Sequence, residues 1–157
     1  MKKVLKIILA TVLFIFIAIQ FYQPALNVDK GQVYTTDFTQ FYKMPVQVKA
    51  MFQTSCYDCH SNNTKYPWYA AIQPVAWWLN DHIEDGKKHL NFSEYGAYNL
   101  RRQYHKMEEV IDEVKEGEMP LSSYTIIHSN AKLTADEKAA LTGWAQSIMD
   151  TMKAKYP

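Results

Sequence analysis

Apolar residues recur at helical spacing in several stretches of this chain, and no stretch alternates apolar and polar residues as a half-buried strand would. Residues 7–19 form an almost unbroken apolar run, which Phe21 and Tyr22 extend. In residues 74–90 and 98–116, apolar side chains return every three or four positions, so they line one face of a helix. The pattern predicts an all-α fold.

Two further helices are indicated by the residues at their ends. Pro45 suits the first turn of a helix that runs into Cys56, because the amide that proline lacks would have no helical partner there. Thr134 and Glu137 have the spacing of a capping box, in which the two residues satisfy each other's free backbone amides. We therefore expect four helices after the N-terminal apolar run.

The N-terminal run has the layout of a segment that directs export. Lys2, Lys3 and Lys6 precede the apolar residues, as in a secretory signal peptide or an uncleaved membrane anchor. The residues that follow the run lack the alternating small side chains that a signal peptidase prefers. Residues 4–22 are also long enough to cross a bilayer. We expect residues 1–22 to form a transmembrane anchor, with the lysines in the cytoplasm and the rest of the chain in the periplasm.

The remaining chain divides into a lead-in and one domain. Residues 23–44 contain Pro24 and Gly31, which interrupt any regular period, so we interpret this stretch as a linker and lead-in. Residues 45–157 then form the domain, since a chain of 157 residues has room for one domain and a short appendage. The formal net charge of +1 argues against a nucleic-acid partner.

The candidate chemistry is concentrated in Cys56-Tyr57-Asp58-Cys59-His60, which has the C-x-x-C-H spacing of covalent haem attachment. Two thiols one helical turn apart can each add to a vinyl group of one porphyrin, and the histidine that follows can offer a nitrogen to the iron. A thioredoxin-like dithiol would follow a strand in a βαβ unit, and a zinc site would need four ligands. The sequence shows neither pattern. We expect one covalent haem c per chain, held by both of its cysteines.

With this motif in place, the chain resembles the bacterial haem-binding domain family of exported, membrane-anchored proteins, and more broadly the class I cytochromes c. Besides the motif, the residues that carry the resemblance are 63–69, 72–75, 82–83 and 119–120. The resemblance covers about residues 35–150. It implies a cytochrome c-like helical domain built around one haem.

The resemblance also bears on the group that completes the iron. Met119 lies in a loop before a proline and ahead of the terminal helix, as the distal methionine does in class I cytochromes, so we expect it to be the sixth ligand. His82 is the alternative sixth ligand, because it shares an apolar face with Trp78. Tyr66, Trp68 and Trp78 are expected to bury the haem and raise its potential.

A haem iron with two axial ligands from the protein transfers electrons and catalyses no bond-forming reaction. We therefore expect a monohaem c-type cytochrome that exchanges single electrons with redox partner proteins at the membrane surface, with no enzymatic activity and no small-molecule substrate. The alternative is a peroxidase-like haem enzyme, or a gas or redox sensor, with an open sixth position. His82 would then be its acid–base group.

Overall fold

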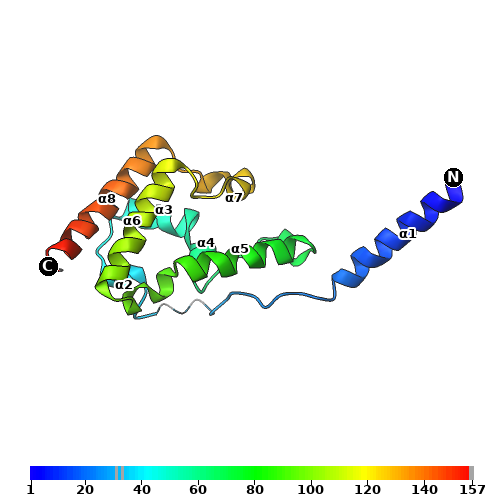
Figure 1. Ribbon diagram of the computed structural model, residues 1–157, viewed down its shortest axis with the longest axis horizontal. Helices are drawn as coiled ribbons and strands as arrows, with labels where there is room; N and C mark the ends of the chain where they lie inside the picture. The colour runs from blue at the N-terminus through cyan, green and yellow to red at the C-terminus, as the bar shows by residue number, and fades with distance from the viewer. Residues whose placement is uncertain (31, 33, 156–157) are drawn as a thin grey trace.

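The computed structural model describes residues 1–30, 32 and 34–155, and within these it contains helices and no strand (Figure 1). The predicted all-α class is therefore confirmed. The α-helices are α1 Lys2–Ile19, α2 Phe38–Phe41, α3 Val46–Ser55, α4 Tyr57–His60, α5 Val75–His89, α6 Leu100–Glu116, α7 Ser122–Ile127 and α8 Ala135–Lys153. Three short 3-10 helices are η1 Trp68–Ala71, η2 Phe92–Ala97 and η3 Ser129–Ala131.

The longer helices of the domain begin and end at residues whose side chains or backbone suit those positions. The Asn99 side chain accepts a hydrogen bond from the Arg102 amide at the start of α6, and Gly117 ends that helix with φ 86°. Only glycine adopts such a positive φ without strain, so a side chain at this position would be costly. The capping box predicted for Thr134 and Glu137 is present at the start of α8, with both of its bonds formed.

The core lies mainly between α6 and α8, which run side by side (Figure 1). On α6, the buried residues Met107, Ile111 and Val114 recur at steps of four and three, as the amphipathic pattern predicts. They belong to one hydrophobic cluster with Leu141 and Ala145 of α8. This pair of helices forms a rigid base for the rest of the domain.

A cluster of aromatic rings joins the lead-in to this core. Phe38 on α2 is fully buried, and its ring centroid lies within 5.7 Å of those of Tyr42, Phe52, Phe92, Tyr95 and Trp144. The stretch 23–44 is therefore more than a linker. Its C-terminal part belongs to the hydrophobic core, because burying the apolar ring of Phe38 there is favourable.

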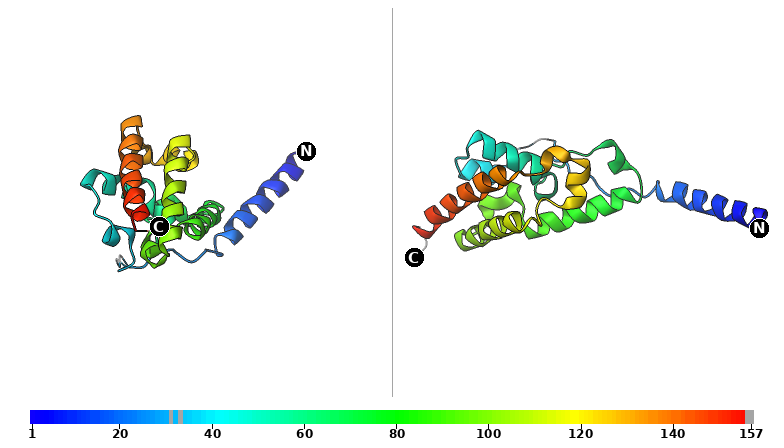
Figure 2. Two further views of the ribbon diagram at one scale, coloured as in Figure 1. Left: turned by 60° about the vertical axis from the view of Figure 1, so that its left-hand side comes forward. Right: turned by 90° about the horizontal axis from the view of Figure 1, so that it is seen from above.

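α1 extends away from the domain and has no buried residue (Figure 2). Its 18 residues include Lys2, Lys3 and Lys6. Among the residues that the structure describes, no helix combines the length and the apolar content that crossing a membrane requires. The N-terminal spanning helix expected from the sequence is thus not supported.

Residues 20–23 and 71–77 form an N-terminal junction between α1 and the domain. The Gln20 Oε1 atom accepts a hydrogen bond from the Gln73 amide at 2.9 Å. The buried Gln73 side chain in turn donates to the Tyr22 carbonyl at 2.8 Å, and the Trp77 indole donates to the same carbonyl at 3.1 Å. Gln23 donates to the Ala71 carbonyl at 3.1 Å. These four bonds fix the place where α1 leaves the domain.

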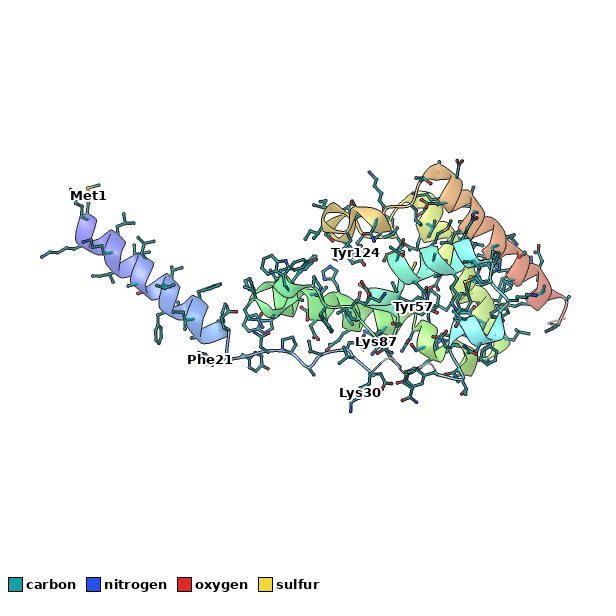
Figure 3. All side chains as sticks on the ribbon, turned by 180° about the vertical axis from the view of Figure 1, so that it is seen from behind. Met1, Phe21, Lys30, Tyr57, Lys87 and Tyr124 are labelled. Atoms are coloured by element: carbon teal, nitrogen blue, oxygen red, sulfur yellow. The ribbon has the colours of Figure 1, made fainter. Side chains whose placement is uncertain are left out.

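Beyond this junction, the chain runs along α5 (Figure 1). Lys87 of α5 donates to the Asn27 side chain at 2.6 Å, and Asn27 donates to the Ser61 carbonyl and the Thr64 hydroxyl. Phe21 and Lys87 mark the two ends of this path in Figure 3. The path therefore ties the N-terminal segment to the residues that follow the C-x-x-C-H motif.

Candidate haem site

The C-x-x-C-H residues occupy one short helical turn that α3 leads into. The amides of Cys59 and His60 both donate to the Cys56 carbonyl, at 3.2 and 3.0 Å. The two thiols are consequently one turn apart, with the imidazole next to the second of them. Both cysteines are free thiols. This is the local geometry that attachment of one porphyrin through two thioethers requires.

Burial keeps both thiols protonated. It raises the pKa of Cys56 to about 12, with a smaller contribution from the nearby Cys59. Burial raises the pKa of Cys59 to about 11, and Asp58 adds to the effect. A dithiol redox centre or a zinc–thiolate site needs the opposite shift, since the thiolate is the reactive and metal-binding form. Among the described residues, no group of three or more His, Cys, Asp or Glu side chains is placed to hold a metal ion by itself.

The His60 imidazole is oriented by the main chain. Its Nδ1 atom lies 2.9 Å from the Leu90 carbonyl oxygen. Because a carbonyl can only accept, Nδ1 carries the hydrogen and Nε2 keeps its lone pair. Burial also lowers the pKa of His60, which favours the neutral ring. A histidine fixed in this way is prepared to bind a metal through Nε2.

His60 and both cysteines line a cavity of about 980 Å³, which also borders α5, α6 and the loop after α6. Its apolar wall is formed by Leu90, Phe92, Val110, Val114 and Leu121. Carboxylates surround it as well, and these are Asp58, Asp81, Glu84, Asp85, Glu109 and Glu113. The volume suits a large flat cofactor. Two thiols, a neutral imidazole and an apolar wall in one cavity fit a covalently held haem.

Met119 and His82 both line this cavity, whereas Tyr66, Trp68 and Trp78 do not. Met119 is half-buried on the loop after α6. His82 is also half-buried, and its Nδ1 atom bonds the Trp78 carbonyl at 2.8 Å. The structure therefore brings both candidates for the sixth ligand to the same cavity as His60.

The three expected aromatic residues are placed elsewhere for identifiable reasons. The Tyr66 hydroxyl accepts a hydrogen bond from the Asn27 amide, so this ring serves the N-terminal segment. Trp68 is 81% exposed on η1. Trp78 lines a smaller neighbouring crevice of about 60 Å³ between α5 and α7. The apolar wall of the cavity comes instead from aliphatic residues with Phe92 and Tyr124, which lie far apart in the sequence.

The two residues between the cysteines attach the motif to the rest of the domain. The Tyr57 hydroxyl donates to Asp37 at 3.3 Å. The Tyr124 hydroxyl donates to the Asp58 carboxylate at 2.8 Å, and the other oxygen of that carboxylate accepts from the Lys65 amide at 3.1 Å. Tyr57 and Tyr124 are labelled in Figure 3. The motif is thereby held from two sides, by α2 and by α7.

Burial and the bond to Asp58 raise the pKa of Tyr124, so its hydroxyl stays protonated and keeps donating. Its ring stacks on His128 with centroids 4.3 Å apart, and His128 bonds the Tyr69 hydroxyl at 2.8 Å. The sequence gives no signal for this connection, and our sequence analysis did not find it. No motif marks Tyr124, because its partner Asp58 occupies a variable position of C-x-x-C-H.

Comparison with known proteins gives one match. The model of a family described as a haem-binding domain matches residues 14–147, which is more than half of the chain and includes every residue placed around the cavity. No curated protein matches the chain. No solved structure matches it either.

Proposed function

The chain belongs to the haem-binding domain family, and from that premise we propose that it is a monohaem c-type cytochrome that carries single electrons. The observation that supports this most is the position of Cys56, Cys59, His60 and Met119 around one cavity of about 980 Å³. Two attachment points and two axial ligands are what such a carrier needs.

Cys56 and Cys59 supply the covalent attachment in this proposal. Each thiol adds across one vinyl group of the porphyrin, so that a carbon–sulfur bond forms and the thiol hydrogen goes to the neighbouring vinyl carbon. The addition needs no oxidant or reductant. Both thiols are free, as the addition requires. The result is one haem c per chain.

His60 and Met119 supply the axial ligands. His60 offers Nε2, because its Nδ1–H is committed to the Leu90 carbonyl. Met119 offers a thioether sulfur, which favours the reduced iron. The bound iron supplies reversible one-electron chemistry. With both positions filled by the protein, no site is left for oxygen, peroxide or a small-molecule substrate, so we assign the chain as a carrier between redox partner proteins and not as an enzyme.

Export places this carrier outside the cytoplasm, where c-type haem is attached. Lys2, Lys3 and Lys6 at the start of an exposed apolar helix are typical of an export segment. We further propose that α1 associates with the membrane and keeps the haem domain near its surface. Such attachment raises the effective concentration of the carrier toward redox partners in the membrane.

Absorption spectra of the natively exported protein test the proposal. We expect a haem that acidified organic solvent does not extract, a far-red band in the oxidised form from iron–sulfur ligation, and no binding of carbon monoxide by the reduced form. A colourless protein, or one whose pigment is extracted, would contradict the haem assignment. A carbon-monoxide-binding form would contradict the carrier assignment alone.

A second candidate function is a peroxidase-like enzyme or a sensor with an open sixth position. His82 favours it, because this half-buried residue lines the cavity with one ring nitrogen bonded to the Trp78 carbonyl and the other available. Peroxide turnover that is lost in His82→Ala would establish this function in place of the first.

A further inference from the structure

Three segments of the chain contain no Asp, Glu, Lys or Arg, and these are residues 7–28, 66–80 and 119–131. Together they hold three of the four tryptophans. Stretches of this length without charge are unusual on the surface of a globular protein, where charged side chains are common. All the charged residues of the chain lie in the other segments.

The fold brings these three segments to one end of the domain. The first and second meet at the N-terminal junction, through the bonds of Gln20, Gln23 and Gln73. The second and third meet where the Tyr69 hydroxyl bonds His128 at 2.8 Å. Figure 1 shows that α7 and the start of α5 lie toward α1, while the C-terminus lies at the opposite side of the molecule.

Large apolar side chains are exposed at this end. Trp68 is 81% exposed and Ile126 is 80% exposed. We define the uncharged end by its exposed side chains, which are Phe21, Tyr22, Trp68, Ile72, Val75, Trp78, Ile126 and Ile127. Large exposed apolar side chains that gather at one end of a domain mark a contact with a protein or with lipid.

We propose that the surface of a lipid bilayer covers the uncharged end. Tryptophan and tyrosine prefer the boundary between water and lipid, because their rings are apolar and carry one polar group. The end is also continuous with α1, whose apolar side chains are exposed along the helix. This inference rests on the membrane association proposed above, and adds to it a defined face of the haem domain.

The charge distribution favours lipid over a protein partner. Protein interfaces have a polar, partly charged rim around their apolar centre. Here Asp58 and Lys65 line the crevice beside the uncharged end, but none of the three segments that form the end has a charged residue. Five carboxylates lie instead on α5 and α6 around the haem cavity. We expect a redox protein to bind at this charged surface, and lipid to cover the uncharged end.

Photolabelling of the haem-loaded full chain in vesicles tests the inference. The vesicles consist of phosphatidylethanolamine and phosphatidylglycerol, with a lipid that carries a photoreactive group on its acyl chain close to the headgroup. After illumination, peptides are analysed by mass spectrometry. We expect lipid labels in residues 66–80 and 119–131 as well as in α1, and none in α8.

A triple variant and a matched control sharpen this test. Trp68→Ser, Ile126→Ser and Ile127→Ser together remove exposed apolar surface, and we expect labelling of the two domain segments to fall about ten-fold. Labelling of α1 should not change. Val46→Ser removes a side chain that is equally exposed, on α3 outside the uncharged end, and should leave every label as it was.

Labels confined to α1, or spread equally over α8, would overturn the inference. So would a triple variant labelled like the unmodified chain. The readout does not involve the iron, so its failure is distinct from that of the proposed function. A protein with the expected spectra and no label at residues 66–80 would overturn the lipid face alone. A protein labelled at residues 66–80 and 119–131 whose spectra differ from those expected above would overturn the carrier function alone.

Discussion

The imidazole of His60 has one ring nitrogen bonded to the Leu90 carbonyl at 2.9 Å, and this bond governs the chemistry of the other nitrogen. The bond fixes the tautomer, restricts rotation of the ring and leaves Nε2 with a lone pair. A second residue, Met119, lines the same cavity and is the sixth ligand in our proposal. Hydrogen bonds and burial thus set the orientation of the side chains in the site.

Met119→Leu tests the sixth ligand while nearly keeping the side-chain volume. We expect loss of the far-red band, binding of carbon monoxide to the reduced form, and a lower reduction potential. The fall in reduction potential should be measurable against the range of roughly 0.8 V over which axial ligands shift haem potentials. Met44→Leu is the control, because Met44 is also partly buried but packs on the core. A band that survives Met119→Leu would point to a different ligand.

Tyr124→Phe tests the support that α7 gives to the motif. The change removes the 2.8 Å bond to Asp58 and leaves that carboxylate with one donor fewer. We expect the free energy of unfolding to fall by about 1–2 kcal/mol, because the bond is to a charged group and is partly buried. Chemical denaturation measures the difference. Tyr22→Phe, on an exposed ring, should cost almost nothing.

Among the helices, the contact between α4 and α5 matters most for the site. Gly86 of α5 faces the Cys59 backbone so closely that a Cβ atom there would lie 2.9 Å from the Cys59 carbonyl oxygen. The lack of a side chain lets α5 approach the motif. The next turn of the chain then carries the Leu90 carbonyl to His60.

Gly86→Ala should therefore destabilise the protein by about 1–3 kcal/mol, because backbone atoms on both sides would have to move apart. It should also lower the fraction of chains that attach haem. Gly143→Ala is the matched control on α8, where an added Cβ would meet nothing within 4 Å. There the same substitution should stabilise by about 0.5–1 kcal/mol, since alanine favours helix. Thermal unfolding of both variants, with opposite signs, would check the contact.

The elements that sequence reasoning recovered are those whose signals are local. The helix expected over 98–116 is observed as Leu100–Glu116, and the one over 74–90 as Val75–His89, because amphipathic spacing and end residues operate within one helix. Trp68, which we expected to bury the haem, is 81% exposed instead. An aromatic residue shows that it will avoid water, but not whether core, cofactor or another surface will cover it.

The same limit applied to the site. Cys56, Cys59 and His60 could be predicted because the attachment chemistry fixes their spacing in the sequence. Tyr124 and the Leu90 carbonyl could not, since they come from distant parts of the chain and meet the motif only after folding. Met119 was found through its place before the terminal helix, and its ligation stays a prediction.

For the molecule as a whole, the N-terminal junction decides how α1 and the haem domain are oriented. Gln73 is completely buried there and bonds to Gln20 and Tyr22. A buried amide with its partners in place is stabilising, but costly once a partner is lost. The hydrogen bonds of the junction thus restrain α1 relative to the domain that contains the cavity.

Gln73→Ala should loosen the N-terminal junction without unfolding the core. We expect chymotrypsin to cleave at Phe21, Tyr22 or Leu26 about ten-fold faster, because local opening would cost less free energy. The haem spectrum should not change. Gln47→Ala, on the exposed surface of α3, is the control and should leave the cleavage rate unaltered. Equal rates for the two variants would mean that the junction does not restrain the segment.

The bond between His60 and Leu90 has a genetic consequence. Its acceptor belongs to the polypeptide backbone, so a missense change at codon 90 does not remove the accepting oxygen. A saturation library scored for haem content should tolerate other aliphatic residues at position 90. Haem content should be sensitive instead to substitutions at codon 86, where an added side chain would push α5 away from the Cys59 backbone.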